Sequence, residues 1–312
     1  MKADDILLSS RSMNHLKHSV FDADLNRSQF ILELSNHEIE KFFQGKSELL
    51  VDDIYYLNAL DSKLFDSTYF KNLKILNIIN TQLESLDQAN TFSCLKSLEE
   101  LNLNDNKIVR INPDLFRDLS TLKKLNLKNN QLHQQNLFGF ESLVNLRELN
   151  LASNQLTLTI GTSFKSLHNL CLLNLSSNHI EHLEDNQFSD LTNLEELYLS
   201  YNRIDRIDSN AFSGLINLKK LILTGNRLES LNGSAFQLLI NMDTLYLSSN
   251  RIEKLDKSVF SKLMRLKKIY LLNNPIRSVA SIHTNQDDDD ESSNSSFFQR
   301  ESTNNKLIQI II

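Results

Sequence analysis

A motif of 24 residues recurs along the middle of the chain and constrains its fold more than any other feature. Each copy opens with L-x-x-L-x-L, in which Met242 and Ile269 replace Leu once each, and Asn stands eight residues after the start. The first seven copies also carry Phe eighteen residues after the start. The copies start at Leu98, Leu122, Leu146, Leu170, Leu194, Leu218, Met242 and Leu266. A fixed period of this length indicates an array of stacked structural units.

The L-x-L segment of each copy predicts a short strand, because alternate residues are apolar. The rest of the copy is long enough for the crossover that parallel pairing requires. Crossovers of this kind are right-handed, and paired strands lie about 4.8 Å apart. A single copy cannot bury its own leucines, so neighbouring copies must cover them. We therefore expect one coil per repeat and a parallel sheet along one side of the stack.

The invariant asparagines predict a ladder of hydrogen bonds inside the coils. A carboxamide can accept a bond from one backbone N–H and donate to carbonyls of an adjacent coil. Aspartate lacks the donors and would place a charge in the core. The ladder consists of Asn106, Asn130, Asn154, Asn178, Asn202, Asn226, Asn250 and Asn274. The Phe column is expected to fill the side of the coil opposite the strands.

The repeat pattern also predicts the organisation of the chain. Regular units begin near residue 73, with Thr81 at a ladder position, and a degenerate first unit covers 47–72, so the predicted array spans 47–280. Residues 1–46 form an N-terminal segment, in which the apolar stretch 28–43 is a candidate cap. Residues 281–312 form an acidic tail that we expect to be disordered. Its closing apolar residues could fold back on the last coil or pair as a strand.

This arrangement resembles the leucine-rich repeat family, in its subclass of about 24 residues with a Phe in the second half of the unit. The resemblance implies an α/β-type solenoid: a right-handed horseshoe with a parallel sheet on its concave face and a mostly irregular or short-helical convex side. It implies binding of other proteins and no catalysis. Members of the subclass include Toll-like receptors, Slit-like proteins and small leucine-rich proteoglycans, which are mostly extracellular. Those proteins usually carry cysteine-rich caps at both ends, and this chain, with 2 Cys, departs from that pattern.

A column of exposed positions on the predicted sheet changes its chemistry along the stack. It holds Asn from residue 77 to residue 174 at each repeat, and then aromatic or aliphatic side chains. Tyrosine offers a large contact area with a polar tip and is enriched in protein interfaces. It also simply suits a sheet surface. The predicted protein-binding residues on the concave face are Tyr198, Tyr201, Ile222, Tyr246, Tyr270 and Leu272.

Charged pairs next to the predicted strands alternate in sign from repeat to repeat, as in Glu99–Glu100 followed by Lys123–Lys124. Opposite charges on adjacent strands can support the register, so we interpret them as structural rather than as a charged ligand site. Gln135 and Thr159 replace apolar residues in successive repeats. They predict either a local bulge that a partner could use or ordinary drift of the repeat.

The sequence contains no motif typical of catalysis, cofactor binding or metal binding. Its 6 scattered Gly form no phosphate-binding loop, and 2 Cys form no cysteine-ligated zinc site. A net charge of −6 disfavours nucleic acid as a partner. His179 and His182, near Glu184 and Asp185, superficially resemble metal ligands, but we interpret them as a solvated loop. We therefore expect no catalytic residues, no cofactor and no metal, with a protein as partner.

We therefore expect a non-catalytic module that binds a protein through its concave face, as a receptor ectodomain fragment or adaptor. Two other functions stay open. One is a regulatory or substrate-recruiting subunit of an intracellular enzyme, and the other is a matrix or adhesion component. No stretch is long and apolar enough to cross a membrane, and the first ten residues do not resemble a signal peptide. The sequence as written thus predicts a cytoplasmic protein, or an extracellular one if it belongs to a longer precursor. Oligomeric state cannot be derived from the repeat.

Overall fold

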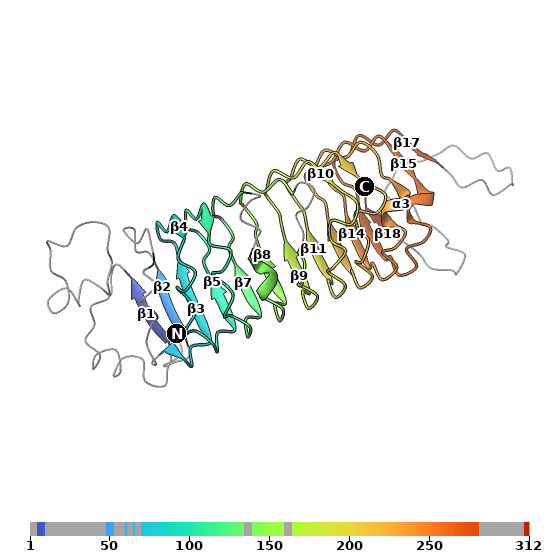
Figure 1. The fold of residues 1–312 in the computed structure, drawn as a ribbon. Helices are drawn as coiled ribbons and strands as arrows, with labels where there is room; N and C mark the ends of the chain where they lie inside the picture. Colours follow the sequence, from blue (N-terminus) through green and yellow to red (C-terminus); the bar gives the residue numbers. More distant parts are fainter. Residues whose placement is uncertain are drawn as a thin grey trace, which may run out of the picture. The chain divides into compact units, whose positions relative to one another are not determined.

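A computed structural model describes residues 5–9, 48–52, 60, 65, 70–133, 139–158, 164–280 and 309–311. The chain divides into two compact units. Unit 1 consists of Met1–Leu156 and Phe164–Leu170, and unit 2 consists of Thr157–Ser163 and Cys171–Ile312. Each unit is a stack of coils, in which every coil contributes one strand to a parallel sheet (Figure 1).

The sheet of unit 1 contains six strands that pair in the order of the sequence, all of them parallel. They are β1 (Asp5–Ser9), β2 (Glu48–Asp52), β3 (Ile75–Ile79), β5 (Glu100–Asn102), β7 (Lys124–Asn126) and β8 (Glu148–Asn150). A second, small sheet pairs β4 (Ser85–Leu86) with β6 (Arg110–Ile111). A 3₁₀ helix, η3, covers Phe140–Ser142.

The sheet of unit 2 follows the same rule, and its strands are again all parallel. They are β9 (Leu172–Asn174), β11 (Glu196–Tyr198), β13 (Lys220–Ile222), β14 (Thr244–Tyr246), β16 (Lys268–Tyr270) and β18 (Gln309–Ile311). Small sheets pair β10 (His182–Leu183) with β12 (Arg206–Ile207), and β15 (Lys254–Asp256) with β17 (Ser278–Ala280). The short helical segments are α3 (Gly233–Phe236) and η4 (Lys257–Phe260). The predicted parallel-strand solenoid with little helix is thus confirmed.

The core of each unit consists of the apolar residues of the repeat. In β5, β7 and β8 the central leucine is buried, while the residues on either side of it stay at least partly exposed. The Phe column is buried as well, and the rings of Phe116 and Phe140 lie 5.7 Å apart in successive coils. The rings of Phe212 and Phe236 repeat this spacing in unit 2. Stacking of coils therefore buries what one coil alone would expose.

Within each unit, ladder asparagines join a coil to the one before it. Asn130 donates from Nδ2 to the carbonyl oxygens of Leu103 in the preceding coil, at 2.9 Å, and Leu127 in its own coil, at 3.1 Å. Its Oδ1 accepts from the N–H of Ile108 at 3.0 Å. Thr81 occupies the ladder position one unit before Asn106. It is buried and donates from its hydroxyl to Oδ1 of Asn106. Both polar ends of the carboxamide are therefore used inside the core.

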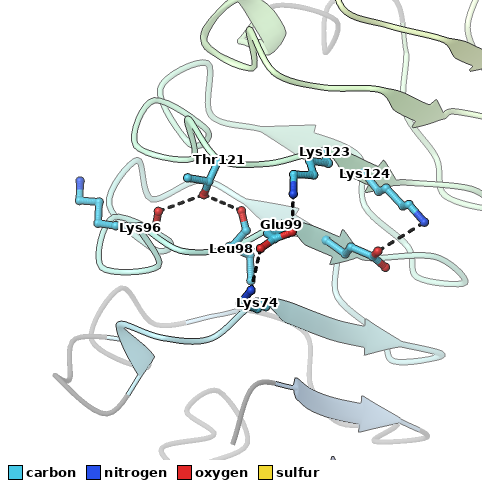
Figure 2. Close-up of polar contacts among 8 residues, drawn as sticks. Lys74, Lys96, Leu98, Glu99, Thr121, Lys123 and Lys124 are labelled. Atoms are coloured by element: carbon cyan, nitrogen blue, oxygen red, sulfur yellow. Dashed lines mark hydrogen bonds and ion pairs between the residues drawn. The ribbon is translucent and has the colours of Figure 1, made fainter.

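A second column of asparagines, which is not part of the motif described above, lies just before the strands. Asn145 donates from Nδ2 to the carbonyl of Ser120, and Asn241 donates to that of Ile216, each at 2.8 Å. Asn169 and Asn217 make the same bond at the same distance. In an earlier coil Thr121 takes this place, and its hydroxyl lies 2.9 Å from the carbonyl of Lys96 (Figure 2). The 24-residue spacing of these residues is the signal that could have revealed this column.

Both ends of the predicted array receive strands from outside it. In unit 1, β1 comes from the segment 1–46 and pairs with β2. In unit 2, β18 comes from the tail 281–312 and pairs with β16, so the closing apolar residues form a strand. The candidate cap 28–43 and residues 281–308 lie outside the described residues, and the boundaries at 46 and 280 stay predictions.

Candidate functional site

The column of exposed positions that changes from Asn to Tyr lies at the last residue of successive strands. In unit 1 the column holds asparagines at the ends of β5, β7 and β8. In unit 2, β9 still ends in Asn174, and the next four strands end in Tyr198, Ile222, Tyr246 and Tyr270. All four side chains are partly exposed, and strand pairing places each one beside the next. We call these four residues the tyrosine strip.

The asparagines of this column have a local structural role. Oδ1 of Asn126 accepts from the N–H of Lys128 at 3.1 Å, and Oδ1 of Asn150 accepts from that of Ala152 at 3.1 Å. The same bond occurs at Asn102 and Asn174. Each asparagine thereby holds the turn that follows its own strand. Tyr and Ile have no acceptor at this position of the side chain, so none of the four residues of the tyrosine strip can make this bond.

Tyr198 is held by charged neighbours on the sheet. Its hydroxyl donates to Oε2 of Glu196 and accepts from Nζ of Lys220 at 3.1 Å. Nζ of Lys220 also lies 4.9 Å from the centre of the Tyr198 ring, within reach of a cation–π contact. Burial, and then the bond to Glu196, raise the pKa of Tyr198. The bond to Tyr198 raises the pKa of Lys220.

Tyr246 and Tyr270 form the other end of the strip. Their rings stack with centroids 4.5 Å apart and an interplanar angle of 1°. Beyond Tyr270 the pairing of β16 with β18 places Ile311, which is partly exposed, next in the column. Sequence reasoning missed Ile311, because it does not follow Tyr270 by one repeat.

The sequence predicts Tyr201 and Leu272 on the same face, but the structure places both after the strands, outside the strip. Tyr201 is 67% exposed and Leu272 is 44% exposed. Tyr201 has a φ of 53°, at a place in the repeat where Asn129, Ser177 and Gly225 also have positive φ. A positive φ is rare for a bulky residue. Whether any of these six residues binds a partner stays a prediction.

The charges beside the strands form ion pairs from strand to strand. In unit 1, Glu99 lies between Nζ of Lys74, at 3.0 Å, and Nζ of Lys123, at 2.6 Å (Figure 2). Lys123 and then Lys74 lower the pKa of the Glu99 carboxyl. Lys124 likewise pairs with Glu100 and Glu148. Each of these charges has an oppositely charged partner on or beside a neighbouring strand, which supports the structural interpretation over a charged ligand site.

The other residues considered in the sequence are the polar replacements Gln135 and Thr159 and the histidines that resemble metal ligands. Gln135 and Thr159 lie outside the described residues. His182 lies in β10, where its Nδ1 is 2.9 Å from Oδ1 of Asp205. The described residues contain no cluster of three or more His, Cys, Asp or Glu side chains that could hold a metal ion. Within the same residues no helix has the length and apolarity needed to cross a membrane.

Comparison with known proteins identifies the family. The family described as "Leucine rich repeat" matches residues 71–132, 98–156, 120–180, 144–204, 168–221 and 216–276, which together are more than half of the chain. No curated protein sequence matches the chain significantly. Family members and the similar structures are typically non-catalytic binding modules.

Several solved structures share the fold. TLR13, in a complex with ssRNA13, is 30% identical with a TM-score of 0.66, covering 75% of this chain and 34% of TLR13. A leucine-rich repeat protein of Leptospira interrogans is 27% identical with a TM-score of 0.57, covering 78% of this chain and 64% of that protein. FLRT2, in a complex with Latrophilin 3 and Unc5D, is 23% identical with a TM-score of 0.62, covering 77% of this chain and 71% of that chain, and shows the fold alone. The chain thus spans about a third of TLR13 and less than two thirds of the Leptospira protein. Together with the stacked coils, these matches show that the chain belongs to the leucine-rich repeat family.

Proposed function

We propose that this chain is a non-catalytic protein-binding module that captures its partner on the exposed sheet face of unit 2, as part of a receptor ectodomain or as an adaptor. The observation that carries this proposal is the change of the strand-end column from Asn to the tyrosine strip. Asparagine at this place holds the following turn, as Asn126 and Asn150 do. An architectural role alone would favour asparagine throughout, because each such bond contributes about 0.5–1.5 kcal/mol.

The strip also has the chemistry of a binding surface. Tyr246 and Tyr270 hold each other in a stack, and Tyr198 is held by Glu196 and Lys220. Side chains that are already ordered lose little conformational entropy when a partner binds. Partly exposed tyrosines then offer a large apolar surface with hydroxyl groups at its border.

The test replaces Tyr198, Tyr246 and Tyr270 by Ala and measures the affinity for proteins retained by the immobilised wild-type chain. We expect the affinity to fall by at least about ten-fold, because aromatic anchors dominate interfaces. The matched control replaces Asn102, Asn126 and Asn150 by Ser, which keeps an acceptor for the turn and should leave binding unchanged. Circular dichroism would establish that both variants are folded. Unchanged affinity of the tyrosine variant would disprove the proposal.

The identity of the retained protein separates the two other functions. A catalytic subunit would favour the role of a regulatory or substrate-recruiting subunit. Self-association of the chain would favour a matrix or adhesion component.

Single-stranded RNA is a second candidate ligand because TLR13, 30% identical over the matched region, was solved in a complex with ssRNA13. The net charge of −6 and the paired charges on the sheet argue against it. Titration with a labelled single-stranded RNA at two salt concentrations would test it, since phosphate contacts produce a steep dependence on salt.

A further inference from the structure

Four large apolar side chains are exposed on the segments that precede β13, β14 and β16. Ile216, Ile240 and Met264 are 50%, 50% and 51% exposed, and Leu238 is 45% exposed. They are four of the seven large apolar side chains exposed among the residues that the structure describes. Ile216, Ile240 and Met264 follow one another at 24-residue steps, so they occupy the same place in three successive coils. We call these four residues the apolar ridge.

A pocket of about 400 Å³, lined by polar and charged residues, lies next to the apolar ridge. Three of its lining residues directly follow ridge residues in the sequence, and the other three stand just before the strands. The lining consists of Asn217, Lys219, Asn241, Asp243, Arg265 and Lys267. It contains three cations and one carboxylate, so we call it the basic pocket.

The three cations of the basic pocket differ in whether they form an ion pair. Lys267 pairs with Asp243, and Lys219 pairs with Glu195 at 2.8 Å. Arg265 has no ion-pair partner among the described residues. A guanidinium can bind a carboxylate through two parallel hydrogen bonds, so Arg265 offers an unused bidentate donor.

Arg265 also breaks the second asparagine column. In the two coils before it, Asn217 and Asn241 donate to backbone carbonyls of the preceding coil, each at 2.8 Å. An asparagine at position 265 would be expected to make the same bond to Ile240. The arginine replaces a structural residue at the point where the apolar ridge is exposed and the pocket opens.

We infer that the apolar ridge and the basic pocket form a second docking surface, for a peptide segment that carries acidic side chains between aliphatic ones. An acidic side chain would complement Arg265, since both lysines of the pocket already form ion pairs, and the aliphatic side chains would cover the ridge. A nucleic acid fits less well, because the surface has no aromatic side chain for base stacking and Asp243 would repel phosphate. The surface lies before the strands, whereas the tyrosine strip lies at their ends, so this inference does not depend on the proposed function.

The test measures fluorescence polarisation of a short labelled peptide in which Glu alternates with Leu. We expect it to bind the wild-type chain and to bind Arg265→Glu at least about ten-fold more weakly. The double variant Ile240→Ser/Met264→Ser should weaken binding to a similar degree. Arg203→Glu, an exposed arginine elsewhere, and Val144→Ser, at the ridge position of an earlier coil, are the matched controls and should bind as the wild type does.

Further variants separate this surface from the tyrosine strip and from a general effect of charge. Tyr246→Ala should retain peptide binding, which separates the failure of this inference from the failure of the proposed function. Arg265→Gln provides a second variant if the charge reversal unfolds the chain. The inference is overturned if the Glu–Leu peptide does not bind, if Arg203→Glu weakens it equally, or if single-stranded oligouridine binds the pocket more tightly. It is also overturned if the chain alone forms a dimer that Arg265→Glu dissociates, because a second copy would then occupy the surface.

Discussion

The ring of Tyr201 lies over the Cα of Gly225 in the next coil, so that a Cβ at Gly225 would stand 2.7 Å from Cδ1 of Tyr201. Both residues have positive φ, 53° for Tyr201 and 73° for Gly225. The glycine therefore satisfies two requirements at once: a left-handed backbone and room for an aromatic ring.

Replacement of Gly225 by Ala should destabilise the chain by about 1–2 kcal/mol, because Ala suffers both the left-handed backbone and the contact with Tyr201. Urea unfolding of the variant would measure this cost. In a Tyr201→Ala background the contact disappears and the cost should fall. Gly233→Ala is the control, since its φ is not positive and its nearest atom would lie at 3.5 Å. Equal destabilisation at both glycines would contradict this account.

Replacement of Asn130 by Ala should lower the free energy of unfolding by about 2 kcal/mol, because it leaves the buried N–H of Ile108 without a partner and removes one of two side-chain amide bonds to the carbonyl of Leu103, which keeps the bond from Asn106. Asn145→Ala should cost about 1 kcal/mol, because Asn145 is exposed and its side chain bonds to the carbonyl of Ser120, at 2.8 Å, on the surface. Chemical denaturation of the two variants side by side would test the difference. A cost at Asn145 equal to that at Asn130 would argue against a buried ladder as the main link between coils.

Burial of Tyr198 and its bond to Glu196, together with the bond that Lys220 makes to Tyr198, should make stability depend on alkaline pH. The pKa values of both groups are raised in the folded state, so the folded chain holds these protons more tightly than the unfolded chain. This contribution is fully present below the unfolded pKa values, which are about 10, and is lost as pH rises through the folded ones. Unfolding curves over this pH range should fall more steeply for the wild type than for Tyr198→Phe. Parallel curves would show that the titration of Tyr198 does not contribute to the pH dependence of stability.

Removal of residues 309–312 should loosen the last coil of unit 2. The N–H of Leu271 donates to the carbonyl of Ile311 at 2.7 Å and would lose this acceptor. Hydrogen exchange at Leu271 should accelerate by at least about ten-fold, because its protection depends on β18. The N–H of Leu247 donates to Tyr270 at 2.8 Å and serves as an internal reference that should change much less. Unaltered exchange at Leu271 would show that β18 is not required to protect this edge.

The periodic sequence predicts which side chains face inward, because one side of each strand must be apolar and every coil repeats the same geometry. That reasoning leads from the Leu, Asn and Phe positions to the parallel solenoid that the structure shows. It also places Tyr198, Tyr246 and Tyr270 in one column, because equal repeat lengths bring equivalent positions side by side.

Features that depend on contacts between particular side chains could not be read from the period. The period predicts Tyr201 beside the strip, but its backbone conformation places it in the turn, over Gly225. The basic pocket is lined by residues of three successive coils, with Asn241 and Asp243 in the middle one. Its members are separated by whole repeats, so the period places them in columns, but only the structure shows that Lys219 pairs with Glu195 and Lys267 with Asp243.

By itself, the sequence determines the coil, its interior and the columns on its surface, since a period of 24 residues leaves stacking of neighbours as the way to bury the leucines. Only the tertiary structure decides how the last strand is covered. Ile311 is placed beside Tyr270 by pairing between β16 and β18, which are distant in the sequence and unrelated by the repeat. Such pairing depends on backbone hydrogen bonds at a sheet edge, and those bonds are available to any strand that reaches it.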